Sequence, residues 1–424
     1  MIGSFGQILY DELGPMQYDE INQDFALMNF CGALGTCLDD LNDVVRETDT
    51  RPSWGLIFDA DNAPLQWLPW MGQFSGTYID PDQVGDLYPN VIKSYLPSLY
   101  WRLNETSGTV ASDLSGNGRD GTYGSGVTLN QPSAIVDDPE DASALFNNNS
   151  NSYVSSTFDL SDLSAGWQRT WVGWAFRNAN TTTDVILAGQ GARHPLFQIY
   201  TGTQNVHFYS DNTVATYANW VNAWPGNRIW THFALQIDDV ANTAELFING
   251  ISKGKQTGMP PINPAAGQFW LGRQSGGPYW NGYLDEIAFY PRLLSPTEIS
   301  QIYNASFSLS PGAQRAVIRN QATGWGRGRP ASIAIVAQTF LTGQKEVIIN
   351  ERDTGAYHYG VITKKLETPS TYLLNAALQR AKPAGLNFSL SVLDLNTYAY
   401  IKSVVPNYAG ALSTFSTYTG LRGG

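Results

Sequence analysis

Between about Tyr100 and Tyr290 the chain is a succession of short runs rich in β-branched and aromatic residues, separated by Gly, Asn, Asp and Ser. The clearest runs are Trp171–Phe176, Leu196–Tyr200, Val206–Tyr209, Thr231–Ile237, Ala244–Ile248, Phe269–Leu271 and Leu284–Tyr290. Many short strands with frequent turn residues are typical of a sandwich or barrel. Asn249-Gly250 predicts a tight hairpin turn, because both residues tolerate positive φ. This texture predicts an all-β block in the middle of the chain.

The segments on either side of this block have residue patterns that are typical of helices. Apolar residues recur every three or four positions over Ile21–Val45, which predicts an amphipathic helix, and a short helix is expected over Pro64–Phe74. Beyond the block, Ser295 followed by Glu298 is a capping-box pattern for a helix over Thr297–Tyr303. Further helices are expected at Pro311–Asn320, Arg329–Phe340, Thr371–Lys382 and Tyr398–Tyr418, with strands at Lys345–Arg352, Tyr357–Thr363 and Asn387–Leu393.

These patterns predict a multidomain α+β chain: a central antiparallel β-sandwich, flanked by α-rich segments that include a small β-β-α-β unit. The sandwich spans residues 98–310. The flanks, 1–97 and 311–424, are either separate domains or the two parts of one split domain that carries the sandwich as an insertion.

The distribution of charge favours the insertion. Residues 1–97 hold 3 basic and 15 acidic side chains, residues 98–310 hold 10 and 17, and residues 311–424 hold 12 and 5. Opposite charge on the two ends favours their docking on each other or on neighbouring copies, hence a homo-oligomer; a chance imbalance between two solvated surfaces is the alternative. The net charge of −12 argues against a nucleic-acid partner.

The sequence gives no support for a membrane protein, a secreted protein or a disulfide-bonded one. No run of about 18 apolar residues is present, so no membrane insertion is expected. The start lacks a secretory signal pattern, so assembly in the cytoplasm is expected. Cys31 and Cys37 lie six apart on the expected helix, about 9 Å along its axis, which is too far for a disulfide. We therefore expect both to be reduced core cysteines.

The middle block resembles the laminin-G-like jelly-roll (concanavalin-A-like) superfamily. Three stretches in order carry the resemblance: Tyr100–Thr109 with Asp113–Tyr123, Trp230–Leu235 with Ala244–Gly250, and Leu271–Arg273 with Trp280–Tyr290 and Leu294–Ile299. Members often hold a calcium ion, which takes carboxylate and carbonyl oxygens. The resemblance suggests Asp113 and Asp285 as candidate ligands. No cofactor is otherwise required, and the alternative is that both are ordinary turn-capping and strand-end aspartates.

The flanks resemble the tail protein I (baseplate-wedge-like) family of phage tail proteins. The similar stretches are Trp54–Gly76, Arg315–Pro330, Glu346–Arg352 and Lys382–Leu386. The resemblance implies a structural protein of the virion, at the tail tip or baseplate, with other tail proteins as partners.

Signatures of catalysis are scarce. None of the four histidines lies in a zinc-binding pattern, and neither a nucleophile elbow nor a Walker loop is present. The adjacent pair Asp285 and Glu286 lies in a predicted strand, where neighbours point to opposite faces, so we do not expect it to form a glycosidase dyad. No enzymatic activity is predicted.

Carbohydrate binding is better supported, because aromatic faces stack on sugar rings. The candidates are Trp220, Trp224, Tyr279 and Trp280, which lie in polar surroundings; the alternative is that these rings fill the core. The sequence thus predicts a minor tail protein whose sandwich contacts host-surface glycans during adsorption. The alternatives are a purely structural tail protein and a tail enzyme that degrades surface polysaccharide.

Overall fold

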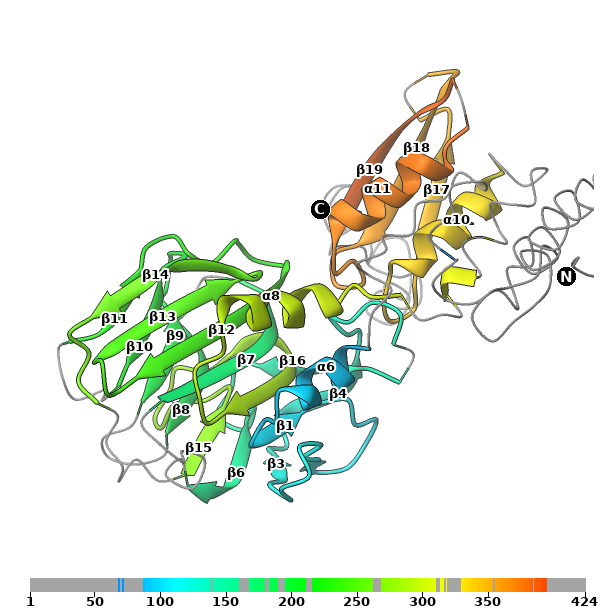
Figure 1. The fold of residues 1–424 in the computed structure, drawn as a ribbon. Helices are drawn as coiled ribbons and strands as arrows, with labels where there is room; N and C mark the ends of the chain where they lie inside the picture. Colours follow the sequence, from blue (N-terminus) through cyan, green and yellow to red (C-terminus); the bar gives the residue numbers. More distant parts are fainter. Residues whose placement is uncertain are drawn as a thin grey trace, which may run out of the picture. The chain divides into compact units, whose positions relative to one another are not determined.

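The computed structural model describes residues 87–394, apart from residues 139, 160–167, 180–182, 190–194, 211–215, 262–267, 310–312, 316–317, 319–328, 354 and 384, together with Leu68 and Met71 (Figure 1). The helices expected at Ile21–Val45 and Tyr398–Tyr418 and the two cysteines lie outside these residues, as do most of those at Pro64–Phe74 and Pro311–Asn320.

The chain divides into two compact units. One comprises Met1–Pro81 with Gln314–Ala322, and the other comprises Asp82–Ala313 with Thr323–Gly424. The second unit therefore holds both the β-sandwich and the small β-β-α-β unit. The joining of residues 1–97 with 311–424 into one split domain stays a prediction.

Eight of the described strands form the first sheet, in the order β14-β13-β12-β7-β16-β5-β4, with β1 beside β16. Their bounds are β1 Leu99–Trp101, β4 Val127–Gln131, β5 Ser143–Asn147, β7 Gln168–Arg177, β12 Trp230–Asp238, β13 Thr243–Ile248, β14 Ile251–Thr257 and β16 Asn281–Tyr290. All the pairings are antiparallel. The expected hairpin is confirmed: Asn249 and Gly250 connect β13 to β14 with φ of 52° and 76°.

Eight more strands form the second sheet, in the order β11-β10-β9-β8-β15-β6-β3-β2. Their bounds are β2 Val110–Ala111, β3 Gly121–Tyr123, β6 Val154–Asp159, β8 Asp184–Gly189, β9 Leu196–Ile199, β10 Val206–Tyr209, β11 Ala218–Trp220 and β15 Gln268–Leu271. These pairings are antiparallel as well. The antiparallel β-sandwich that the sequence predicts is therefore confirmed.

The main core lies between the two sheets and is rich in aromatic rings. Trp101 stacks on Phe269 with ring centroids 5.6 Å apart, and Trp171 meets the same ring edge-on at 5.2 Å. Because successive strand residues point to opposite faces, every second residue of the central strands enters this core. At Gly282, a Cβ atom would lie 1.9 Å from the carbonyl oxygen of Phe176, so only glycine fits there.

Three of the four residues predicted to bind carbohydrate belong to this core. Trp220, Trp224 and Trp280 are only 3%, 1% and 0% exposed, and the rings of Trp224 and Trp280 meet edge-on at 6.5 Å. These three rings have no exposed face on which a sugar could stack, so they fill the core, as the alternative stated. Their polar sequence neighbours suggested a loop surface, but the large rings are needed to fill the space between the sheets.

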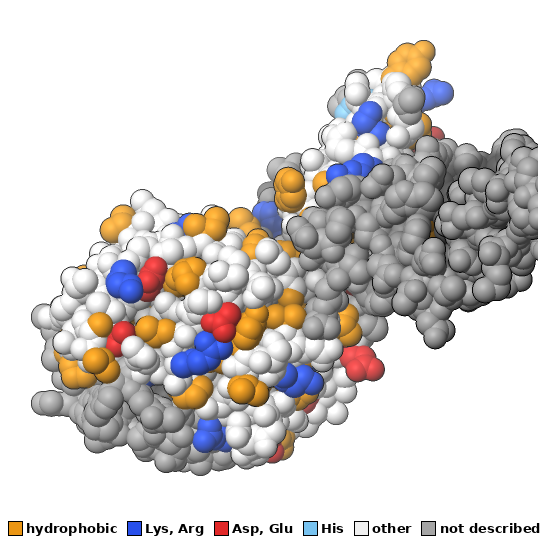
Figure 2. Space-filling model, in the orientation of Figure 1, with side chains coloured by type: hydrophobic (Ala, Val, Ile, Leu, Met, Phe, Trp, Pro, Cys, Tyr) orange, Lys and Arg blue, Asp and Glu red, His pale blue; other side chains and the backbone are white. Residues whose placement is uncertain are grey.

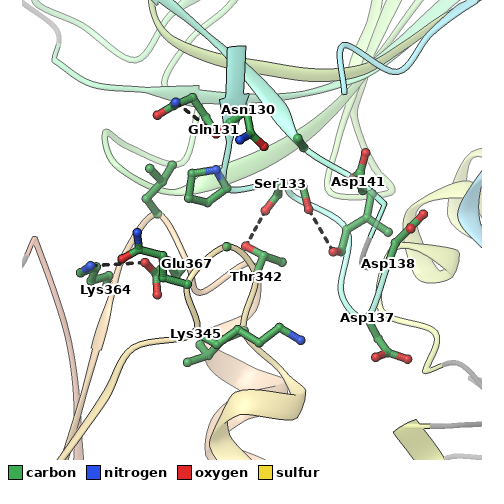
Figure 3. A pocket seen from close by; sticks show the side chains of 17 residues that line it. Asn130, Gln131, Ser133, Asp137, Asp138, Asp141, Thr342, Lys345, Lys364 and Glu367 are labelled. Atoms are coloured by element: carbon green, nitrogen blue, oxygen red, sulfur yellow. Dashed lines mark hydrogen bonds and ion pairs between the residues drawn. The ribbon is translucent and has the colours of Figure 1, made fainter. Parts of the chain in front are cut away.

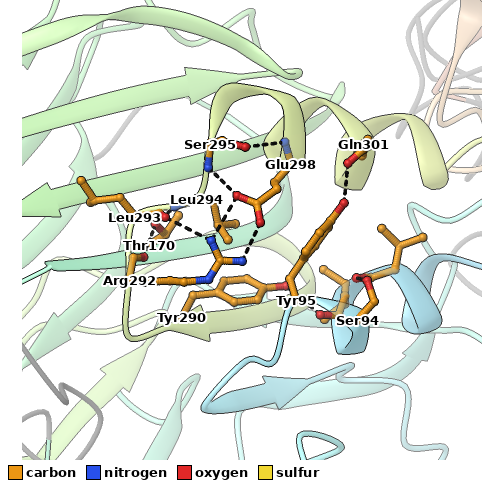
Figure 4. A network of polar contacts seen from close by, with 12 residues as sticks. Ser94, Tyr95, Thr170, Tyr290, Arg292, Leu293, Leu294, Ser295, Glu298 and Gln301 are labelled. Atoms are coloured by element: carbon orange, nitrogen blue, oxygen red, sulfur yellow. Dashed lines mark hydrogen bonds and ion pairs between the residues drawn. The ribbon is translucent and has the colours of Figure 1, made fainter.

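The outer face of the first sheet is covered by two helices, α6 (Tyr88–Ser94) and α8 (Pro296–Ala305), which pack in a second hydrophobic core. The predicted capping box at the start of α8 is confirmed: Glu298 N donates to Ser295 Oγ at 3.2 Å, and Ser295 N donates to Glu298 Oε2 at 2.6 Å (Figure 4). Tyr95, which follows α6, donates to Gln301 on α8. The two helices are thus joined over the sheet.

The small C-terminal unit has the predicted β-β-α-β order. Its elements are α10 Pro330–Thr339, β17 Val347–Glu351, β18 His358–Lys364, α11 Thr371–Ala381 and β19 Asn387–Leu393. It contacts the sandwich on the same side as α8. Trp230 Nε1 donates to the carbonyl of Leu366 at 2.9 Å, and Thr342 Oγ1 donates to that of Ser133 at 2.8 Å. The outer face of the first sheet is therefore used for internal packing.

Figure 2 shows the side of the sandwich that carries α6 and α8, where charged side chains are sparse among uncharged ones and some of opposite charge lie next to each other. None of the described helices is long and apolar enough to cross a membrane.

A core role for Trp280 has a measurable consequence. We expect Trp280→Ala to lower the free energy of unfolding by about 3–5 kcal/mol, because it leaves a cavity between the sheets. Urea denaturation of the full chain measures this. The control is Tyr357→Ala, at a side chain that is 73% exposed, which should change stability by about 0.5 kcal/mol or less. Equal stabilities of the two variants would contradict the core assignment.

Candidate functional site

The outer face of the second sheet carries a row of aromatic side chains. Along β10, Val206 and Phe208 point into the core, so His207 and Tyr209 point outward. Tyr200 directly follows β9 and Tyr217 directly precedes β11, the two neighbours of β10. We call the surface formed by Tyr200, His207, Tyr209 and Tyr217 the tyrosine face.

The rings of the tyrosine face contact one another in sequence across three strands. Tyr200 stacks on His207 with centroids 5.0 Å apart, His207 lies 4.8 Å from Tyr217, and Tyr217 stacks on Tyr209 at 4.7 Å. Tyr200 and Tyr217 are 44% and 39% exposed, whereas His207 is 5% exposed. The arrangement is a continuous aromatic surface with a buried centre and accessible edges.

Polar atoms without partners accompany these rings. Neither ring nitrogen of His207 meets hydrogen-bond geometry with any described residue, and the same holds for Asn219 Oδ1, on the residue opposite His207 in β11. Burial lowers the pKa of His207, although Asn219 opposes this shift, so the imidazole is neutral at pH 7. These polar atoms are buried, so the surface offers a sugar its aromatic rings for stacking and the phenol hydroxyls of the exposed Tyr200 and Tyr217 for hydrogen bonds.

Tyr279, the fourth predicted carbohydrate residue, lies elsewhere. It is half-buried and pairs with Arg273 in an isolated antiparallel bridge. The Arg273 guanidinium lies over the rings of Tyr153 and Trp270, 4.9 Å and 4.4 Å from their centroids. Tyr279 is thus part of a separate cluster, and its predicted role in sugar binding stays a prediction.

A cluster of buried carboxylates lies on the outer face of the first sheet. Asp141, Asp285 and Glu286 each place one oxygen within 4.8 Å of the others. The expectation that Asp285 and Glu286 point to opposite faces is wrong, because β16 contains a bulge. From Asp285 to Ala288 the strand advances three residues while β7 advances two, and Glu286 has a φ of 54°. The extra residue turns both side chains to the same side.

One guanidinium, that of Arg102, forms ion pairs with the acids around it. Arg102 lies 2.8 Å from Asp138, Asp141 and Glu286, and Tyr100 also donates to Glu286. Asp285 Oδ2 accepts from Ala134 N at 2.8 Å, whereas Asp285 Oδ1 and Asp141 Oδ2, both buried, accept from no described residue. Among the described residues, four carboxylates therefore lie around one positive charge, that of Arg102.

Burial, together with this charge imbalance, raises the pKa of the cluster acids. Burial is the main cause for Asp141, Asp285 and Glu286, and repulsion between neighbouring carboxylates adds to it at Asp141 and Asp285. Either protons or a cation would relieve the repulsion. Asp141 and Asp285 have buried oxygens that accept from no described residue, and Glu286 adds a third carboxylate beside them. Carboxylate oxygens are the donors that a calcium ion prefers, so the residues present fit the ion.

A cavity of about 670 Å³ reaches the cluster at Asp141. Figure 3 shows Asp137, Asp138 and Asp141 on one side of it, with Lys364 and Glu367 of the C-terminal unit on the other. The cavity gives a route by which a small ion could approach the buried acids.

The other predicted calcium ligand, Asp113, does not belong to this cluster. Its Oδ1 accepts from the backbone of Tyr100 and Ser115, and its Oδ2 accepts from Arg119 N and Ser115 Oγ, at 2.8–3.0 Å. This carboxylate caps its own loop, as the alternative reading stated. The structure places Asp285 with Asp141 and Glu286 instead.

Sequence reasoning missed the residues of the tyrosine face and of the acidic cluster other than Asp285. The alternation in Val206–Tyr209 already placed His207 and Tyr209 on one face, so the tyrosine face could have been found from the sequence. Asp141 and Glu286 could not, because a bulge and a long loop bring them together.

Residues 148–300 match the model of the concanavalin A-like lectin/glucanases superfamily, and the chain carries a jelly-roll domain of this type. No curated protein matches it.

The chain is similar to several solved structures. Domain 4 of AbnA, a GH43 extracellular arabinanase from Geobacillus stearothermophilus, in complex with arabinotriose, is 18% identical, with 49% of this chain and 98% of that chain covered and a TM-score of 0.37. The botulinum neurotoxin type G receptor binding domain is 15% identical (49% and 50% covered, TM-score 0.36). The binding domain of Paraclostridial Mosquitocidal Protein 1 is also 15% identical (51% and 53% covered, TM-score 0.40). The chain spans about half the length of the latter two.

Proposed function

We propose that the β-sandwich is a recognition module that binds glycans on the tyrosine face. The observation that carries this proposal is the row of contacting rings in which Tyr200 and Tyr217 are accessible around the buried His207. Sugar rings present apolar faces edged by hydroxyl groups, and this surface offers both stacking and hydrogen bonding. The outer face of the central strands of the first sheet is covered by α6, α8 and the C-terminal unit, so it does not offer an equivalent surface.

The module has no turnover chemistry in this proposal. The acids that approach one another most closely, Asp141, Asp285 and Glu286, have side chains buried beneath the first sheet. A polysaccharide chain must lie in a groove between two carboxylates to be cleaved, and burial argues against such access. Recognition would rest on several weak contacts, strengthened by multiple copies.

The same proposal assigns the chain to a phage tail tip or baseplate, as a minor tail protein assembled in the host cytoplasm. Support comes from the resemblance of both flanks to tail protein I and from their opposite charges, which favour docking between copies or with other tail proteins. The sandwich would then contact host envelope glycans during adsorption. A purely structural tail protein is the second candidate, in which the tyrosine face packs on a neighbouring protein.

We further propose that Asp141, Asp285 and Glu286 hold a calcium ion. It would offset the negative charge that Arg102 leaves unpaired, and it would join β16 to the 132–141 segment that contacts the C-terminal unit. The proposed role of the ion is structural, because the site lies under the first sheet rather than on the tyrosine face.

Replacing the accessible rings tests glycan binding. We expect the double variant Tyr200→Ala, Tyr217→Ala to bind host envelope polysaccharide about tenfold more weakly than the wild-type chain, a loss of about 1.4 kcal/mol, with little change in melting temperature. Affinity electrophoresis of the full chain measures the loss. The matched control is Tyr372→Ala, which removes a ring that is 79% exposed in the C-terminal unit. Equal losses in both variants would contradict the assignment.

The tail assignment predicts where the protein is found. Purified virions should contain it, and antibodies raised against the full chain should label the tail end in electron micrographs. Its absence from virions, or labelling at the capsid only, would sink this part of the proposal while leaving glycan binding open to the test above.

Calcium should stabilise the fold in a manner that depends on pH. The raised pKa values mean that the folded state holds protons on the cluster above the ordinary carboxyl range, so its stability falls as pH rises. We expect added calcium to raise the melting temperature more at pH 8 than at pH 5, because protons compete with the ion for the carboxylates. Asp285→Asn should reduce the effect. An equal response of wild type and variant would contradict the proposed site.

A further inference from the structure

Arg273 differs from five other arginines of the sandwich, which form ion pairs. Each of those pairs with a carboxylate: Arg102 with Asp138, Asp141 and Glu286, Arg169 with Asp239, Arg177 with Asp184, Arg228 with Asp394 and Arg292 with Glu298. Arg273 pairs with no carboxylate of the described chain. Its Nη1 donates only to the backbone carbonyl of Ser150, at 2.9 Å, and its buried Nε has no partner there.

Aromatic rings hold this guanidinium in place. It lies 4.4 Å from the ring centroid of Trp270 and 4.9 Å from that of Tyr153, and these two rings are themselves 6.2 Å apart. Trp270 lies on the outer face of the second sheet, because its neighbours Phe269 and Leu271 enter the core. The positive charge is therefore fixed on the sheet face that also carries the tyrosine face, and no carboxylate among the described residues neutralises it.

The loop after β15 brings a further ring to the same place. Arg273 and Tyr279 face each other in an antiparallel bridge, which sets their side chains on the same side. Two backbone bonds close the loop: Gln274 N donates to the Pro278 carbonyl and Gly277 N donates to the Gln274 carbonyl, both at 3.1 Å. Tyr279 is half-buried and packs against Gly277. The cluster is thus built in advance of any ligand.

We infer that Arg273, with Tyr153, Trp270 and Tyr279, binds an anionic group on a sugar, either a carboxylate or a sulfate ester. A guanidinium presents parallel N–H donors that match such an anion, and stacking on rings orients it. Tyr279 supplies an adjacent ring on which the sugar can lie. This inference rests on the proposed glycan-binding function, and it adds that the recognised glycan is acidic.

The test compares the full-length chain and its variants on pairs of glycans that differ only in charge. The probes are oligogalacturonate against its methyl ester, sialyllactose against lactose, and sulfated lactose against lactose, each measured by titration calorimetry. The wild-type chain should bind the acidic member of at least one pair tenfold or more tightly. Arg273→Gln should abolish this preference and leave affinity for the neutral member unchanged. The carboxylated and sulfated pairs distinguish the two anions.

Two further variants keep the result interpretable. Arg273→Lys retains the positive charge but not the planar guanidinium, so it should keep only part of the preference for acidic glycans. This variant also tests the inference if Arg273→Gln fails to fold. Lys253→Gln removes an exposed charge from β14 and should change nothing. The inference is overturned if no acidic preference exists or if it survives Arg273→Gln. Neutral binding that depends on Tyr200 and Tyr217 without an acidic preference would overturn this inference alone, whereas no binding to any probe would overturn the proposed function as well.

Discussion

The packing of two sheets through one aromatic interface determines which side chains of this protein are left for function. Large rings from both sheets, among them Trp101, Trp171 and Phe269, fill the space between them. Strand alternation then commits the remaining residues to the two outer faces. On the first sheet these residues bury themselves against α6, α8 and the C-terminal unit. On the second sheet, outer side chains of β8 and β9 are buried in a small cluster of their own, whereas Tyr200 and Tyr217 keep accessible edges. We propose this part of the second sheet for ligand recognition.

The bulge at Glu286 is the second constraint. A regular strand would direct Glu286 into the aromatic core, where an ionised carboxylate is very costly. The extra residue in β16 turns it to the side of Asp285 and Arg102 instead. The result is a buried group of acids with too little positive charge. That group lies close to Ser133 and Ala134, and Ser133 accepts a hydrogen bond from Thr342 of the C-terminal unit. The buried acids therefore lie next to the junction between the sandwich and that unit.

Much of the fold could be predicted from the sequence, because it depends on local signals. The run Val206–Tyr209, the turn at Asn249-Gly250 and the capping box at Ser295 each specify their structure within a few residues, and all three are confirmed. The candidate site was harder to predict. Whether Trp280 lines a surface or fills a core depends on the partner sheet. The grouping of Asp141 with Glu286 depends on a bulge that cannot be predicted from the residue types. The jelly-roll resemblance gave the architecture but not the positions of the accessible rings.

The central claim is that ligands bind on the outer face of the second sheet. Hydrogen–deuterium exchange of the full chain, with and without host envelope polysaccharide, tests it most directly. The account predicts slower exchange in peptides that cover Leu196–Trp220 and unchanged exchange in β12, β13 and β14. Protection confined to the first sheet, or protection nowhere in the sandwich at saturating polysaccharide, would contradict it.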